Sequence, residues 1–112
     1  MKVRDIVSAL GLELAAGADG LDNAVTGGYA SDLLSCAMAN AKAGNVWVTL
    51  QSHVNVIAVA SLINLACVII TEGMQPDDEM LARANENRVP TLLTPHGTYR
   101  TVGELISLGI EG

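Results

Sequence analysis

The sequence predicts an α/β fold of three layers, in which helices flank a mostly parallel or mixed sheet. Segments with helical and strand-like apolar spacing follow one another over 112 residues in the order α-β-β-α-β-α-β-α-β-α. Three consecutive strand–helix units with short connections favour parallel neighbouring strands joined by right-handed crossovers. Half of the residues are hydrophobic but only 3% are aromatic, so we expect an aliphatic core. No linker or repeat interrupts the pattern, which predicts one domain over residues 1–112.

The N-terminal segment predicts a helix followed by two strands. Apolar residues recur at i, i+3, i+4 and i+7 over residues 3–10, and Gly11 is suited to end that helix. Alternating polarity predicts a short strand over residues 12–16. A turn over residues 17–20 then leads to a second strand over residues 25–29.

The next segments predict a helix, a strand and a longer helix. The first helix is expected over residues 33–43, with Ser31 or Asp32 as its N-cap. An unbroken run of β-forming residues predicts a strand over residues 46–50. The longer helix, over residues 51–66, is apolar on nearly all sides, so both sides must be covered. In a chain this small, a second copy of the chain could supply one cover.

The C-terminal part predicts two further strands and two helices. They are expected over residues 67–71, 76–87, 89–94 and 102–108, in the order β-α-β-α. The first of these strands is continuously apolar, as in the centre of a parallel sheet. Pro76 is suited to the first position of its helix, and Thr101 with Glu104 predicts a capping box for the last helix.

Composition excludes several classes of partner. The net charge is −6, and the six basic residues are scattered. Nucleic acids and anionic membrane surfaces are bound by clustered Lys and Arg, so we expect neither as a partner.

Cys36 and Cys67 lie in apolar segments without C-x-x-C spacing, as expected of buried thiols in a reducing compartment. The most apolar run, residues 54–70, is broken by Ser61 and Asn64, and no signal peptide is evident. We therefore expect a cytoplasmic protein.

A Gly-Gly pair before a predicted helix is the first candidate site. Gly27 and Gly28 would let backbone N–H groups approach a phosphate or a carboxylate near the start of the helix. The alternative is that the two glycines only let backbone segments pack closely. The spacing fits neither a Walker loop nor a dinucleotide fingerprint, and no Lys follows, so we exclude those nucleotide sites.

A polar cluster at the start of residues 51–66 is the second candidate site. Gln51, Ser52, His53 and Asn55 follow a strand, and ligands of doubly wound sheets bind at the carboxyl ends of the strands. The alternative is that Ser52 caps the helix while His53 and Asn55 face solvent. His96 follows another strand and could approach His53.

No complete catalytic or metal-binding set is recognisable. Ser, His and Asp are present near the predicted strand ends, but without a local signature of nucleophilic catalysis. Asp32 is better explained as a helix cap. His53 and His96 lack the spacing of metal ligands. We therefore expect neither an enzyme nor a bound cofactor or metal.

The chain resembles the DRTGG domain family, whose name motif ends in Thr-Gly-Gly. The resemblance rests on Thr26, Gly27 and Gly28, on the acid-containing segment that follows, and on the strand leading into residues 51–55. Ala24 and Val25 replace the Asp-Arg of the motif, so the role of that arginine is not carried over.

The resemblance implies a fold similar to the N-terminal domain of HPr kinase/phosphorylase and of the Mur ligases. DRTGG domains occur alone, with CBS-domain pyrophosphatases and in phosphotransacetylase-related proteins. The P-loop of the kinase lies in a separate domain without a counterpart here. The family therefore implies a non-catalytic accessory domain that serves assembly or regulation.

Three functional hypotheses follow. The first is a stand-alone cytoplasmic regulatory module that forms a homodimer with two-fold symmetry. The second is a sensor of a small anionic ligand, a nucleotide or a phosphorylated metabolite. The third is an accessory subunit of an enzyme or kinase complex. The expected ligand pocket of the second hypothesis comprises Gly27, Gly28, Asp32, Gln51, Ser52, His53, Asn55 and His96.

Overall fold

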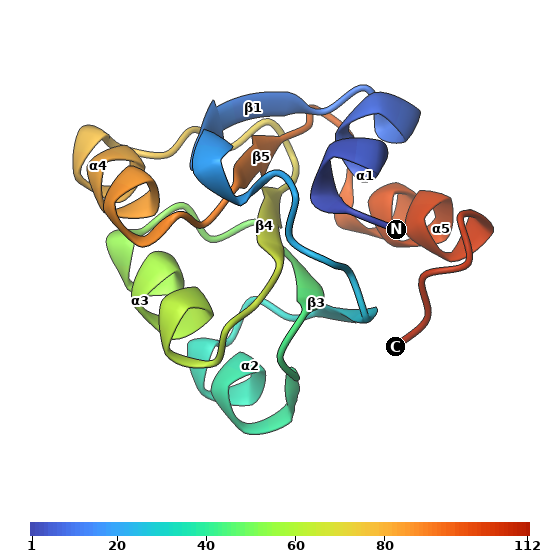
Figure 1. Cartoon of the computed structure of the whole chain (residues 1–112), viewed down its shortest axis with the longest axis horizontal. Coiled ribbons are helices and arrows are strands. Elements are labelled where there is room, and N and C mark those ends of the chain that lie inside the picture. The colour runs from blue at the N-terminus through green and yellow to red at the C-terminus, as the bar shows by residue number, and fades with distance from the viewer.

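The computed structural model describes all 112 residues as an α/β fold around one mixed five-stranded sheet (Figure 1). In spatial order the strands are β1 (Glu13–Ala16), β5 (Thr91–Leu93), β4 (Cys67–Ile70), β3 (Asn45–Thr49) and β2 (Gly27–Ala30). Strands β2 to β5 run parallel, and β1 is antiparallel to β5 at one edge. The predicted fold class and element order are therefore confirmed.

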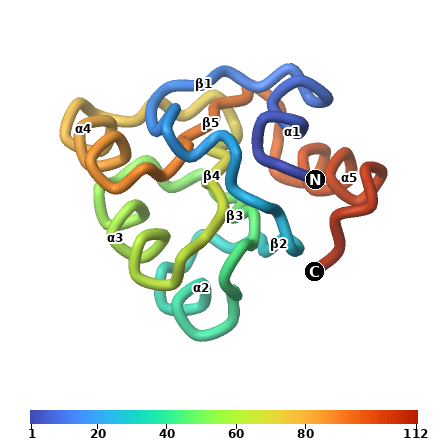
Figure 2. The backbone as a smooth tube through the Cα atoms, viewed as in Figure 1, coloured from blue at the N-terminus to red at the C-terminus, as the bar shows by residue number.

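Helices cover both faces of the sheet. One face carries α2 (Leu34–Asn40), α3 (Val54–Leu62) and α4 (Asp78–Asn87), and the other carries α1 (Val3–Leu10) and α5 (Thr98–Ser107). Figure 2 follows the connection from β1 to β2, which crosses from one edge of the sheet to the other and contains a short 3-10 turn, Ala18–Gly20. The first residues of the chain hold this connection, since Val25 N donates to Met1 O at 2.9 Å.

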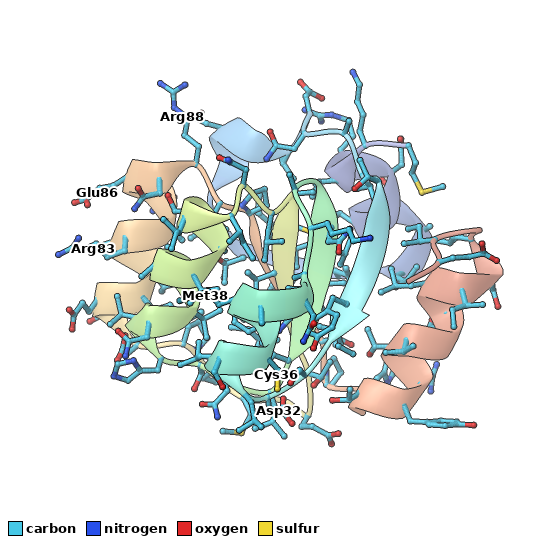
Figure 3. All side chains as sticks on the ribbon, turned by 90° about the horizontal axis from the view of Figure 1, so that it is seen from below. Asp32, Cys36, Met38, Arg83, Glu86 and Arg88 are labelled. Carbon is cyan, nitrogen blue, oxygen red and sulfur yellow. The ribbon has the colours of Figure 1, made fainter.

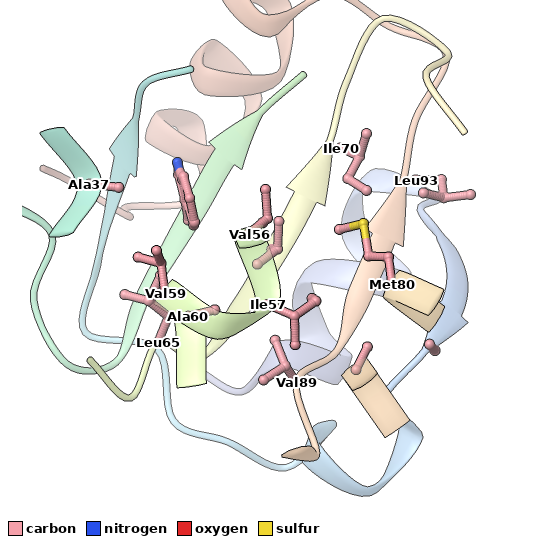
Figure 4. Packing of buried hydrophobic residues seen from close by; sticks show 14 residues of the cluster. Ala37, Val56, Ile57, Val59, Ala60, Leu65, Ile70, Met80, Val89 and Leu93 are labelled. Atoms are coloured by element: carbon pink, nitrogen blue, oxygen red, sulfur yellow. The ribbon is translucent and has the colours of Figure 1, made fainter. Parts of the chain in front are cut away.

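The core consists of two apolar clusters, one on each face of the sheet. Alternation along β3 directs Trp47 toward the three-helix face and Val46 and Val48 toward the two-helix face. Figure 4 shows the first cluster, in which α3 and α4 pack side by side over the strands. Trp47 is fully buried and its indole N–H donates to Ser31 O at 2.9 Å. The rest of the buried apolar core is aliphatic or sulfur-containing, as the composition predicted.

Two element boundaries near the candidate sites differ from prediction. Strand β2 covers Gly27–Ala30 and not residues 25–29, so the Gly-Gly pair lies in the strand, as predicted, but at its start and away from the first turn of α2. The N-cap of α2 is Leu33, not Ser31 or Asp32. Ser31 Oγ accepts from Leu33 N at 3.1 Å, which closes a turn before the helix, and the Asp32 carboxylate is directed toward β3 instead.

Helix α3 is shorter than predicted and is covered within the chain. Its N-cap is His53, not Ser52, and the helix ends at Leu62 because Asn64 adopts a left-handed conformation with φ 56°. The sheet lies under the helix, while α2 and α4 pack against its sides. A second copy is therefore not needed to cover most of α3, although Leu62 is 68% exposed.

The two C-terminal helices begin differently from prediction. Asp77 is the N-cap of α4 and its carboxylate accepts from Met80 N at 2.8 Å, so Pro76 precedes the helix. Helix α5 begins at Thr98, with Gly97 as N-cap. Thr101 is buried inside the helix and its hydroxyl donates to Gly97 O at 2.9 Å, so the predicted capping box is wrong.

Candidate functional site

The predicted site residues lie at two different ends of the sheet. The loops after β2, β3 and β5 carry Asp32, Gln51, Ser52, His53 and His96 at the carboxyl ends of the parallel strands. Figure 3 shows Asp32 beyond the tips of the strands, at the end toward which they point.

Asp32 links the loops after β2 and β3. Its Oδ1 accepts from the Thr49 hydroxyl at 3.0 Å and from Leu50 N at 2.9 Å. The Gln51 side-chain amide donates to Asp32 O at 3.2 Å, and Gln51 N donates to Thr49 Oγ1 at 3.1 Å. Thr49 is fully buried. This carboxylate therefore has a structural role, holding two loops in register.

A second network joins the loops after β4 and β5. The hydroxyls of Thr71 and Thr98 lie 2.7 Å apart, and Thr98 N donates to the Glu72 carboxylate at 3.0 Å. Glu72 N in turn donates to His96 O at 2.8 Å. These residues had no signal in the sequence, because isolated Thr and Glu have many roles.

The two histidines belong to different loops and do not form one site. His53 caps α3, with Nδ1 accepting from Asn55 N at 3.1 Å, while His96 follows β5, two strands away from β3. Asn55 lies in the first turn of α3 and borders a hollow between α3 and α4. No group of three His, Cys, Asp or Glu side chains is arranged to hold a metal ion.

Gly27 and Gly28 lie at the other end of the strands, where β2 pairs with Asn45 and Val46 at the start of β3. The C-terminal segment runs along the outer edge of β2, and Gly28 N donates to Glu111 O at 3.0 Å. A Cβ on Gly27 would lie only 2.8 Å from Glu111 O. Close backbone approach therefore requires a glycine at Gly27, and the expected convergence of this pair with the Ser52 helix start is wrong.

A pocket of about 540 Å³ opens beside this glycine pair, between the edge of β2 and the loop that follows α2. We call it the polar pocket. It is lined by Thr26, Gly27, Gly28, Tyr29, Asn40, Lys42, Ala43, Asn45, Glu111 and Gly112. The Asn45 side chain links two of the lining segments. Its Oδ1 accepts from Lys42 N at 3.0 Å, and its Nδ2 donates to Thr26 Oγ1 at 3.4 Å. Lys42 is exposed and its ammonium makes no salt bridge in the chain.

A second hollow of about 300 Å³ lies on the opposite face of β2, under α5. We call it the apolar groove. Its lining comprises Gly28, Tyr29, Ala30, Val48, Val102, Leu105, Ile106, Ile110 and Gly112. It exists because Gly28 and Ala30 contribute little side-chain volume to the sheet face that α5 covers. The two hollows share Gly28, Tyr29 and Gly112, so they meet across the edge strand. Sequence reasoning missed the groove, although small residues at alternate positions of one strand were a visible signal.

Comparison with known proteins decides the family. The sequence model of the DRTGG domain matches residues 5–108. The chain belongs to the DRTGG domain family. Among curated proteins no sequence matches it.

A solved structure has the same fold as this DRTGG domain. It is the regulatory region of a Clostridium perfringens pyrophosphatase, with CBS and DRTGG domains, complexed with its activator diadenosine tetraphosphate. The TM-score is 0.74 at 14% sequence identity, and the match covers 94% of this chain but 46% of that one. At this identity the likeness establishes the fold alone.

The thiols of this DRTGG domain differ in environment. Burial raises the pKa of the Cys67 thiol to about 12, which keeps it protonated and unreactive as a nucleophile. Cys36 is only half-buried, so the expectation of two buried thiols is wrong for Cys36.

At the surface, a hydrogen bond from Arg4 lowers the pKa of the Asp22 carboxyl. None of the helices is both long and apolar enough to cross a membrane.

Proposed function

We propose that this DRTGG domain is a cytoplasmic regulatory module that binds a small anionic ligand, a nucleotide or a phosphorylated metabolite, without chemistry of its own. The observation that carries the proposal is the polar pocket. It combines the unpaired ammonium of Lys42 with a half-buried aromatic ring, Tyr29, and with amide groups. A phosphate group could pair with the ammonium of Lys42, and a nucleotide base could stack on the ring of Tyr29.

The apolar groove supports the same proposal. It adjoins the polar pocket at Gly28, so a ligand with a charged and an apolar part could contact both. The related regulatory region is complexed with a dinucleoside polyphosphate activator, which has this mixed chemistry. Self-association as a homodimer is part of the same proposed module.

Structural roles of the polar residues at the carboxyl end argue against catalysis there. Asp32 and Glu72 accept hydrogen bonds from backbone amides, and His53 caps a helix. A general base or an activated nucleophile needs a lone pair directed at a substrate.

Ligand binding is tested by thermal unfolding with inorganic phosphate, AMP, ATP and diadenosine tetraphosphate. A ligand at a hundredfold excess over its Kd stabilises by about 2.7 kcal/mol. We expect Lys42→Gln to weaken binding about tenfold or more, because a charge-assisted contact is lost. Lys2→Gln is the matched control, since it removes the only other lysine, which lies near Asp22. Absence of stabilisation by all four probes at millimolar concentration would refute the proposal.

The same experiment distinguishes the two ends of the sheet. Gln51→Ala removes the side-chain hydrogen bond to Asp32 O at the carboxyl end of the strands, and it leaves the lining of the polar pocket unchanged. Binding that is weakened by Gln51→Ala but not by Lys42→Gln would place the ligand at the carboxyl end and overturn the choice of the polar pocket.

A further inference from the structure

The outer edge of β2 carries backbone groups that no strand of the sheet pairs. Ser31 N donates to Val48 O at 3.2 Å, so alternate residues along this segment pair with β3. The backbone groups of Gly28 and Ala30 therefore point away from the sheet. Gly28 N donates to Glu111 O, whereas Ala30 is exposed and its N–H has no partner in the chain. Figure 3 shows β2, in cyan, as the outermost strand on the side of α5.

Residues 110–112 cover part of this edge and show what it accepts. Ile110 lines the apolar groove, and its Cγ2 would lie 3.6 Å from a Cβ on Gly28. Glu111 lines the polar pocket on the other face of β2. Successive side chains of an extended strand point to opposite faces of a sheet. An apolar residue next to an acidic one therefore fits the two hollows that flank β2.

The last two of these residues are weakly held. Ile110 is buried, and its backbone N donates to a carbonyl of α5 at 3.1 Å. Glu111 and Gly112 are exposed, and the hydrogen bond from Gly28 N to Glu111 O is the only one that either residue makes. A partner strand that displaces them breaks this one bond. It gains the outward donors and acceptors of both Gly28 and Ala30.

The charges beside the edge select the sequence of such a strand. Lys42 and Glu111 are the only charged residues that line the polar pocket, and the Lys42 ammonium makes no salt bridge. Displacement of Glu111 leaves Lys42 to pair with an acidic side chain of the partner. The apolar groove has no charged residue in its lining. The side chains on that face of the partner strand are therefore apolar.

We propose that the outer edge of β2 binds a partner protein by strand addition, through an extended segment in which apolar and acidic residues alternate. The segment displaces residues 111–112, places apolar side chains in the apolar groove and pairs an acidic side chain with Lys42. The inference goes beyond the proposed function, because the partner is a protein and its main contacts are to the backbone of Gly28 and Ala30.

Fluorescence anisotropy with a labelled synthetic peptide that alternates Val and Glu tests the docking site, with no small ligand present. We expect saturable binding at micromolar to high micromolar concentrations. The control peptide has the same residues in one block of Val and one block of Glu. It should bind at least about tenfold more weakly, because it cannot place both residue types in their hollows. Equal affinities, or no binding of the alternating peptide at millimolar concentration, would overturn the proposal.

Two variants test the backbone pairing. Ala30→Pro removes the free N–H at the edge, where strands tolerate proline, and should weaken binding about tenfold or more. Deletion of residues 111–112 should strengthen binding about threefold, because the competing hydrogen bond to Gly28 is gone. A folded Ala30→Pro variant that binds as well as the unmodified chain, or weaker binding after the deletion, would overturn strand addition.

A third variant tests the charge and does not depend on the stability of Ala30→Pro. Lys42→Gln changes an exposed side chain. It should weaken binding of the Val–Glu peptide about threefold or more, and it should leave binding of a Val–Gln peptide unchanged. An equal loss for both peptides would refute the pairing of Lys42 with an acidic residue.

Discussion

Replacing Asp32 by Ala should loosen the carboxyl end of the sheet. The substitution removes the acceptor for Thr49 Oγ1 and for Leu50 N, at 3.0 and 2.9 Å. A hydrogen bond to a charged group contributes about 1.5–3 kcal/mol, and the exposure of Asp32 favours the lower end of that range. For two such bonds we expect a loss of about 2–3 kcal/mol, which lowers the Tm by roughly 8–12 °C in a domain of this size.

Urea unfolding followed by fluorescence measures this loss, because Trp47 is the only tryptophan and is fully buried beside the same loop. Asp32→Asn retains one side-chain acceptor and should lose no more than about half as much. Thr49→Val combined with Asp32→Ala should be less destabilising than the sum of the two single changes, since the residues share a bond. A loss below about 0.5 kcal/mol for Asp32→Ala would refute the structural role of the carboxylate.

Three further predictions concern backbone and titration. The ordinary pKa of a Cys thiol is 9.0, so Cys67 ionises above pH 9 in the unfolded chain, whereas burial raises its pKa to about 12 in the folded chain. The free energy of unfolding should therefore be unaffected by Cys67 below pH 9 and fall by about 1.4 kcal/mol per pH unit between pH 9 and about 12. The slope should be absent in Cys67→Ala, and equal slopes in both proteins would contradict the assignment. Gly17→Ala should destabilise far more than Gly11→Ala, because both residues have positive φ but only at Gly17 would the new Cβ clash with a backbone atom, the carbonyl oxygen of Val89. Equal urea midpoints for the two variants would count against this. Gly103→Ala should stabilise the chain by roughly 1 kcal/mol, because a Cβ at this helical position meets no atom within 4 Å, and an unchanged or lowered urea midpoint would contradict this.

The order of the elements could be predicted because each one carries a local signal. The continuous apolar run of β4 and the helical spacing of α1 depend on neighbours in the sequence. Boundaries were less accurate where a side chain had two uses. Asp32 could cap α2 or bond to β3, and only the placement of Thr49 decides between them. The early end of α3 depends on Asn64, a residue that tolerates but does not require left-handed backbone.

The candidate site was predictable only in part. The chain order correctly put Gln51 and His53 at the carboxyl end of β3. It put the Gly-Gly pair in a strand over residues 25–29 but could not show that the strand begins at Gly27, because the preceding Val25 and Thr26 are themselves strand-forming residues. The polar pocket depends on contact between β2 and Glu111 at the far end of the chain. Contacts of such sequence separation have no local signal.

The antiparallel edge strand has a consequence for how the chain is made. Strand β1 is synthesised before its pairing partner, because Glu13 pairs with Leu93 and β2, β3 and β4 are made between them. The units from β3 to β5 can assemble from neighbouring segments, whereas β1 has to wait. We expect β1 to gain protection last in pulsed hydrogen exchange during refolding, and early protection would contradict this order. During the delay an unpaired β1 could dock on β5 of another nascent chain, so newly made copies that fold close together are at risk of exchanging this strand.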